Sequence, residues 1–308
     1  MEKNEQKIQA SRVSAKREMF DAGETKDRIG PKLKKSKFLD SLEEVEDFFI
    51  NQSMERGYDN AYDVVAAENP CFKTLSYTEY GSNFMVMPLN NDLRRDMILD
   101  SLISPVSEII RWDKYYEQVI SNKAANKYSD RNTINKIARK SLIVPVGTNK
   151  FIDILDIEKI ADVCKRESAF VKPHPITTHE YIGLLMDKCG EDSVLKRDDD
   201  LYALMVNSKK IYTTHYSESM LYAAMLGKDI DVVDKLGRHY LAGFWHFNSF
   251  ILRTPKKNRI PQLNKILSSH HSGVFNPRIE KDWKNKMILF LDYMDERRKH
   301  FEGVYITK

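Results

Sequence analysis

The sequence has few cysteines and no long apolar run. Its three cysteines are odd in number, far apart along the chain and without the spacing of metal ligands, so we expect reduced, structural thiols at Cys71, Cys164 and Cys189. No apolar stretch approaches the roughly 20 residues that a membrane-spanning helix needs. The amino terminus also lacks the apolar segment of a signal peptide. These absences predict a cytoplasmic protein.

The composition is otherwise that of a globular protein with a slight excess of positive charge. Hydrophobic residues make up 42% and charged residues 31%, and 308 residues are enough for two domains or one large domain. The net charge of +4 is compatible with an anionic partner but does not identify one. Basic clusters at residues 32–37 and 253–259 are either solvated loops or contacts with nucleic-acid phosphates. The candidate DNA contacts are Lys34, Lys35, Arg253, Lys256, Lys257 and Arg259.

Strand and helix signals alternate regularly between residues 168 and 234. A short apolar run at residues 168–172 stops at a proline-rich loop, as expected of a buried strand. A second strand is predicted at residues 211–214, a helix at residues 217–226 and a third strand at residues 230–233. Strand, helix and strand with short connections predict a parallel sheet with right-handed crossovers, in which ligands bind at the carboxyl ends of the strands.

Polar residues that suit a bound phosphate follow these predicted strands. Lys172 supplies a positive charge, His174 can hydrogen-bond, and backbone N–H groups at the start of the helix after Tyr216 favour an anion. We therefore expect an anionic ligand at this edge of the sheet. The candidate ligand-binding residues are Lys172, His174, Tyr216, Ser217 and Ser219.

The same residues carry a resemblance to a known family. The motif Lys-Pro-His-Pro after a strand, a serine-containing turn, a helix rich in small residues and a Gly-Lys pair before another strand resemble the nucleotide-binding half of glycosyltransferase-B enzymes. The sequence is most similar to the capsule and lipopolysaccharide enzymes that transfer Kdo from its CMP derivative, over roughly residues 141–234. In that family the His-Pro motif holds the donor phosphate and the serine turn helps to bind the nucleotide. The resemblance thus implies donor-binding roles for Lys172, His174, Ser217 and Ser219.

The chain also departs from the family pattern. Such enzymes commonly carry a Ser-Thr pair and later a Glu-Ala pair on this helix, where this sequence has Ser217-Glu218-Ser219 and Tyr222-Ala223.

The resemblance implies an α/β fold of the glycosyltransferase-B type, with two Rossmann-like domains, a cleft between them and a carboxyl-terminal helix that crosses back. We place an acceptor-side domain at residues 1–138, a donor-binding domain at residues 139–280 and the returning helix at residues 281–308. Helical periodicity at residues 38–51 and 280–300, and an apolar strand at residues 142–146, agree with this division.

Glycosyl transfer needs a base for the acceptor hydroxyl and groups that stabilise the departing phosphate. Lys172 and His174 suit the second task, so His174 is also a catalytic candidate. The candidate bases are Asp153, Glu218, Glu79 and Glu24. Asp153 and Glu218 have a structural alternative, since carboxylates cap helices and stabilise their first turns.

No permanently bound cofactor or metal is predicted. The spacings of His174 with His179 and of His215 with His239 fit no usual metal site. The expected small-molecule partner is a CMP-, CDP- or UDP-linked sugar.

Three functions remain open. Resemblance to phage enzymes that glycosylate hydroxymethylated cytosine implies transfer of a sugar, with arabinose one option, to 5-hydroxymethylcytosine in double-stranded DNA within the host cytoplasm. The base would then have to flip out of the duplex. The second possibility is a Kdo-type transferase that acts on a bacterial surface glycan. The third is a non-catalytic nucleotide- or nucleic-acid-binding protein, in which the aromatic segment at residues 240–252 packs in the core or stacks on bases.

Overall fold

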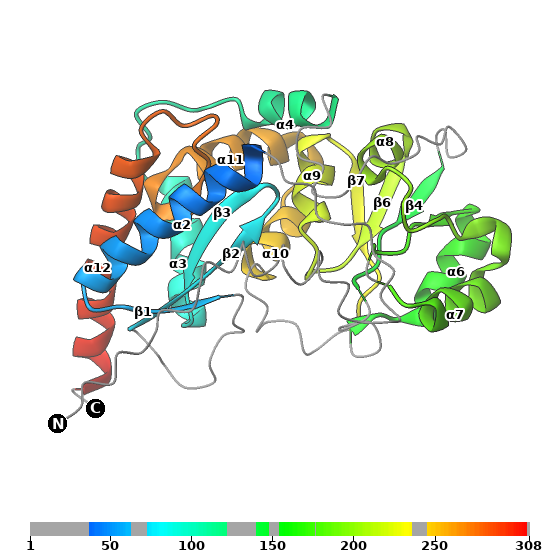
Figure 1. The fold of residues 1–308 in the computed structure, drawn as a ribbon, viewed down its shortest axis with the longest axis horizontal. Helices are drawn as coiled ribbons and strands as arrows, with labels where there is room; N and C mark the ends of the chain where they lie inside the picture. The colour runs from blue at the N-terminus through cyan, green and yellow to red at the C-terminus, as the bar shows by residue number, and fades with distance from the viewer. Residues whose placement is uncertain are drawn as a thin grey trace.

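The computed structural model describes residues 37–62, 73–121, 140–147, 154–175, 177–235 and 245–306, in which helices surround two four-stranded sheets (Figure 1). The mixed α/β class predicted from the sequence is confirmed. The predictions for Glu24, Lys34, Lys35, Cys71 and Asp153 lie outside the described residues.

The first sheet is mixed, with the strand order β1-β2-β3-β8. Its strands are β1 (Asp59–Tyr62), β2 (Thr74–Tyr80), β3 (Asn83–Pro88) and β8 (Val274–Phe275). β1 is parallel to β2, whereas β2 with β3 and β3 with β8 are antiparallel. The turn between β2 and β3 is Gly81-Ser82, and both residues have positive φ, 55° and 64°, as a type I′ hairpin turn requires.

This sheet differs from the second Rossmann-like sheet that the resemblance implies. A two-residue turn can join only antiparallel strands, because a parallel connection needs a crossover of a dozen or more residues. β8 also lies within the segment expected to form the donor-binding domain, yet it pairs with β3. Among the described residues, the amino-terminal region therefore shares its sheet with the carboxyl-terminal region.

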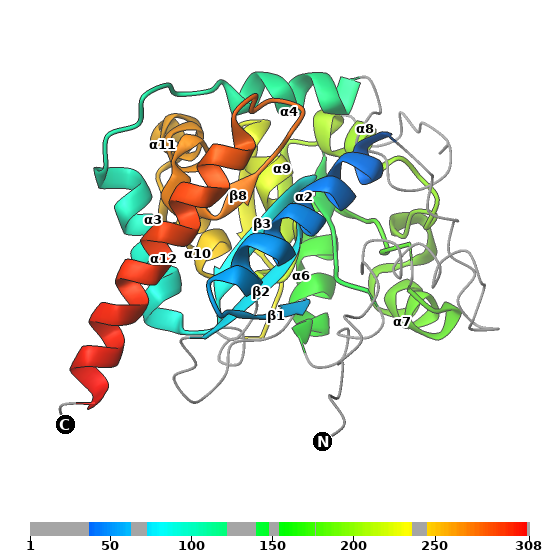
Figure 2. The same cartoon turned by 60° about the vertical axis from the view of Figure 1, so that its left-hand side comes forward.

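Helices from both ends of the chain cover the first sheet. They are α2 (Lys37–Glu55), α3 (Asn91–Ile103), α4 (Trp112–Ser121), α10 (Trp245–Arg253), α11 (Lys256–Ser268) and α12 (Trp283–Ile306). The long helix expected near the carboxyl terminus is α12, which packs against α2 and β8 (Figure 2). Two ion pairs that involve Arg56, just after α2, with Asp292 and Asp295 of α12 add to this contact.

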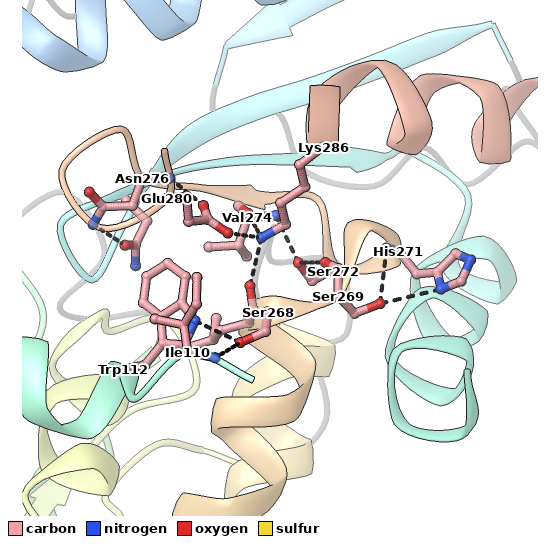
Figure 3. Close-up of polar contacts among 12 residues, drawn as sticks. Ile110, Trp112, Ser268, Ser269, His271, Ser272, Val274, Asn276, Glu280 and Lys286 are labelled. Atoms are coloured by element: carbon pink, nitrogen blue, oxygen red, sulfur yellow. Dashed lines mark hydrogen bonds and ion pairs between the residues drawn. The ribbon is translucent and has the colours of Figure 1, made fainter. Parts of the chain in front are cut away.

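Lys286, whose side chain is only 10% exposed, joins α12 to its neighbours (Figure 3). The Nζ of Lys286 donates hydrogen bonds to Leu267 O at the end of α11 (2.6 Å), to Val274 O of β8 (2.8 Å) and to the carboxylate of Glu280. Glu280 in turn accepts the backbone N–H of Asn276 at 2.8 Å. The 3₁₀ turn η3 (His270–Ser272) lies between α11 and β8.

The second sheet is entirely parallel, with the strand order β5-β4-β6-β7. Its strands are β4 (Ser141–Ile143), β5 (Phe170–Val171), β6 (Lys210–Thr213) and β7 (Asp229–Val232). The connections contain α6 (Ile157–Glu167), α7 (His179–Cys189), the 3₁₀ turn η2 (Glu191–Ser193), α8 (Leu201–Asn207) and α9 (Ser219–Met225). The predicted alternation of strands and helices is confirmed. Asp200 caps α8 with its side chain, and Gly227 after α9 has a positive φ.

The two sheets share one hydrophobic core. A continuous cluster of buried side chains runs from α2 and the first sheet, through α4, α9, α10 and α11, to one face of the second sheet. A smaller cluster fills the space between the second sheet and the helices α6 and α7. Within the described part of the chain, no helix combines the length and apolar character needed to cross a membrane.

Two of the cysteines meet in the structure although they are far apart in the sequence. Cys164 on α6 and Cys189 at the end of α7 are free thiols that share a hydrogen bond. This bond, together with burial, raises the pKa of Cys164, whereas it lowers the pKa of the more exposed Cys189.

Candidate functional site

The polar residues singled out in the sequence lie at the carboxyl edge of the second sheet. Lys172 and His174 follow β5, residues 214–219 follow β6, and Asp234 follows β7. This is the edge at which open parallel sheets bind ligands. β4 separates β5 from β6, whereas β6 and β7 are direct neighbours.

The turn after β6 is rich in hydroxyl groups. The Oγ of Ser219 lies 2.8 Å from Oγ1 of Thr213 and 2.6 Å from Oγ of Ser217. The backbone N–H of Ser219 also donates to Ser217 Oγ at 3.2 Å. Ser219 is buried and Ser217 is half-buried, so Ser217 is the member of this chain of hydroxyls that a ligand can reach.

A histidine and a carboxylate form a pair on the same turn. Nδ1 of His215 lies 2.8 Å from Oδ2 of Asp234, and the backbone N–H of His215 donates to the same oxygen at 2.9 Å. The side chain of Asp234 is only 2% exposed and that of His215 is 16% exposed. The ring of Trp245, at the start of α10, stacks on the imidazole with centroids 5.8 Å apart and planes 26° apart.

Asn248 of α10 holds the turn in place from the other side. Its Nδ2 donates to His215 O at 2.8 Å and to Ser217 O at 3.1 Å, while its Oδ1 accepts from the hydroxyl of Tyr80 at 2.5 Å. Burial and the charge of Glu218 raise the pKa of Tyr80, which therefore stays a neutral donor. The turn after β6 is thus anchored to both α10 and β2.

Glu218 contacts the first sheet. Its Oε2 accepts the backbone N–H of Gly81 at 3.1 Å, in the hairpin turn between β2 and β3. A Cβ on Gly81 would lie 2.6 Å from Leu221 of α9, so the hairpin turn and the start of α9 are in close contact. Glu218, predicted as a candidate base, therefore joins the two sheets at this point.

Lys172 is buried, with 1% of its surface exposed. Its Nζ donates to Pro173 O and Arg197 O, both at 2.8 Å. These bonds hold the loop after β5 to the segment before α8, so Lys172 positions the loop that carries His174. The half-buried His174 lies on this loop, and its carbonyl accepts the N–H of Thr177 at 2.9 Å.

Two further candidate site residues are Tyr216, beside the second sheet, and Glu79, on the first sheet. Tyr216 is half-buried, and burial together with the charge of Asp234 raises its pKa. Glu79 lies on β2, and its partly buried side chain belongs to the first sheet.

The predicted DNA contacts divide into two kinds. Arg253, Lys256 and Lys257 are exposed at the junction of α10 and α11, and Lys256 pairs with Asp229 at 2.9 Å. Arg259 is instead buried, and its guanidinium donates to Ile251 O, Lys228 O and Thr254 O at 3.1, 3.1 and 3.4 Å. Arg259 therefore holds the backbone together at this junction.

Sequence reasoning missed His215, Asp234 and Asn248. Asp234 directly follows a predicted strand, so the rule that selected Ser217 could also have found it. The sequence suggested only a metal-ligand role for His215, paired with His239. Among the residues that the structure describes, no group of three or more His, Cys, Asp or Glu could hold a metal.

These features define a mixed α/β protein with a hydroxyl-rich turn and a His–Asp pair at the carboxyl edge of a parallel sheet. In comparison with known proteins, the chain matches no family model and no curated sequence.

Proposed function

We propose that this protein is a glycosyltransferase that moves a sugar from a nucleotide-sugar donor to 5-hydroxymethylcytosine in phage DNA. The observation that carries the proposal is the clustering of Ser217, His215 and Asp234 on adjacent strand ends of the parallel sheet. An arrangement that combines hydrogen-bond donors with a group able to exchange protons suits the transfer of a phosphate-linked sugar.

The donor would lie along the turn after β6. Ser217 would donate a hydrogen bond to the donor phosphate, and His174 would approach it from the loop after β5, which Lys172 holds in place. These donors would stabilise the charge that builds up on the phosphate as the anomeric C–O bond breaks. CMP-, CDP- and UDP-linked sugars are the candidate donors, and arabinose is one option for the sugar, which the resemblance to the phage enzymes implies.

The acceptor would approach from the exposed basic corner between α10 and α11. Arg253, Lys256 and Lys257 lie there. Trp245, which stacks on His215, opens α10 at the site, whereas Lys256 pairs with Asp229 at the amino end of β7, so the DNA would have to extend along α10 to reach the carboxyl edge. Cations of this kind contact phosphates and position the DNA without reading its sequence.

The test is mass spectrometry of nucleosides from hydroxymethylcytosine DNA after incubation with the protein and CMP-, CDP-, UDP- and GDP-sugars. We expect a new nucleoside that is heavier by one sugar. Release of free nucleotide without a new nucleoside would move the acceptor to a glycan. If neither product forms with any donor, the proposal is wrong and the non-catalytic binding function is favoured instead.

A single substitution tests the donor site in the same assay. His174→Ala should reduce transfer by about 100-fold or more, because it removes a donor aimed at the charge of the transition state. The exposed His300 of α12 offers a matched control, and His300→Ala should keep full activity. Full activity in His174→Ala, with an unchanged melting temperature in both variants, would remove His174 from the site.

A further inference from the structure

We propose that His215, held by Asp234, is the base that accepts the proton of the acceptor hydroxyl. This inference rests on the proposed function and names a base other than the sequence candidates Asp153, Glu218, Glu79 and Glu24.

The hydrogen bonds of Asp234 determine which ring nitrogen of His215 carries a proton. An ionised carboxylate only accepts hydrogen bonds, so Nδ1 must donate to the oxygen 2.8 Å away. The lone pair of the neutral ring is then on Nε2. The backbone N–H of His215 binds the same carboxylate oxygen, which fixes the residue relative to β7.

The same carboxylate stabilises the product of proton transfer. A protonated imidazole next to a buried carboxylate gains an ion pair in a place with little water, as in other His–Asp pairs that act as bases. Tyr216 also lies near Asp234, but its raised pKa keeps it neutral, so it adds no competing charge.

His215 also has the access that a base needs. Trp245 covers one face of the imidazole, and the side chain is 16% exposed. Nε2 has no hydrogen-bond partner within the described ranges of the chain. His215 is two residues before Ser217, and Asn248 holds the carbonyls of both, so the base and the donor-binding hydroxyl would keep a fixed distance.

The alternative base with a described side chain on this turn is engaged elsewhere. Glu218 accepts the backbone N–H of Gly81 in the first sheet. His215 thus offers the more direct arrangement for proton transfer on the turn that carries Ser217.

In the proposed step, the acceptor oxygen bonds to the anomeric carbon as the bond from that carbon to the phosphate oxygen breaks. The electron pair of the broken bond stays on the nucleotide phosphate. The hydroxyl proton passes to Nε2 and then to water, so no further reactant is needed.

The test compares His215→Ala with the wild-type protein and with His300→Ala as a matched control on α12. We expect kcat of His215→Ala to fall by about 100- to 10,000-fold, the range for loss of a general base, while the affinity for the free nucleotide changes by less than about threefold. Added imidazole should restore part of the lost activity in proportion to its concentration, because it can occupy the space beside Trp245 and accept the proton. Asp234→Asn should also lower kcat, and imidazole should not rescue it.

Several results would overturn the assignment. Activity of His215→Ala within threefold of the wild type would show that His215 is not the base. Lost activity with no imidazole rescue and weakened nucleotide binding would show a structural role instead. Thermal melting of every variant separates these results from unfolding. If the wild-type protein forms no product, the proposed function itself fails, and the assignment of the base fails with it.

Discussion

The ammonium group of Lys286 donates its three N–H hydrogens to Leu267 O, Val274 O and the Glu280 carboxylate. Lys286→Met should lower the free energy of unfolding by about 3–5 kcal/mol, because it leaves the Glu280 carboxylate buried without its partner. The measurement is equilibrium denaturation in urea. Lys284→Met, on the exposed side of the same helix, is the control and should change stability by less than about 1 kcal/mol.

A double variant separates loss of the charge pair from loss of packing. Lys286→Met combined with Glu280→Gln removes both charges but keeps an acceptor for the N–H of Asn276. We expect this double variant to be more stable than Lys286→Met alone. A double variant at least as unstable as the single one would mean that the bonds to Leu267 and Val274, and not the unpaired charge, account for the loss.

At the scale of elements, the glycine before β8 leaves the least room for a side chain among the glycines that the structure describes. Gly273 has a φ of +65°, and a Cβ there would lie 2.1 Å from the carbonyl oxygen of Val86. Gly273→Ala should therefore cost about 3 kcal/mol, from left-handed backbone strain plus displacement of β3. Gly57→Ala is the matched control, because Gly57 has a φ of +76° but no atom within 4 Å of the added Cβ. Equal losses in the two variants would contradict the steric explanation.

The second sheet could be predicted from the sequence because its strands follow one another closely. Each strand is bounded by local signals, and each helix between them has its own cap or stop, such as Asp200 and Gly227. The first sheet could not be predicted in the same way. β8 has only two residues, and its partner strand β3, with Phe84, lies far earlier in the chain. Its place depends on tertiary packing and leaves no periodic pattern in the sequence.

The same distinction applies to the candidate site. Ser217 and Tyr216 follow a predicted strand, so a rule about strand ends found them. Lys172 also follows a strand, but sequence alone does not reveal that its ammonium meets the carbonyl of Arg197. The roles of Asn248 and of the stacked Trp245 depend on how α10 packs on the turn, which only the folded chain defines.

At the scale of the whole molecule, the half-buried histidines His246, His270 and His271 have lowered pKa values and make stability depend on pH. Burial, with the charge of Arg94, lowers the pKa of His246 to about 4, and burial, with the charge of His270, lowers that of His271 to about 4. Because unfolded histidines bind protons at a pH near 6.5, the unfolded chain gains more protons than the folded chain as the pH falls from about 6.5 to 4. The free energy of unfolding should therefore fall across that window.

Urea denaturation at a series of pH values tests this dependence. His246→Gln should show a smaller loss of stability between pH 6.5 and 4 than the wild type, since one of the histidines with a lowered pKa no longer titrates. His300→Gln alters an exposed histidine and should leave the slope unchanged. A wild-type stability that stays constant over this range would disprove the prediction.

The proposed binding to DNA should depend on specific lysines more than on the net charge of the protein. Lys256→Gln with Lys257→Gln should weaken DNA binding and reduce the slope of log K against log salt by about one to two, if each lysine neutralises one phosphate. Lys281→Gln with Lys299→Gln removes the same charge from exposed positions elsewhere and should change the slope less. Identical slopes in both double variants would mean that only the total charge matters.

The pairing of β3 with β8 also has a consequence for folding during synthesis. β3 ends at Pro88, but its edge stays open until Val274 and Phe275 have left the ribosome. The second sheet, whose last strand ends at Val232, is complete well before that point. We therefore expect the order of folding on the ribosome to reverse the order of the sequence, with the amino-terminal sheet closing last. Until then, the exposed edge of β3 would be the part of the nascent chain that most needs protection by a chaperone.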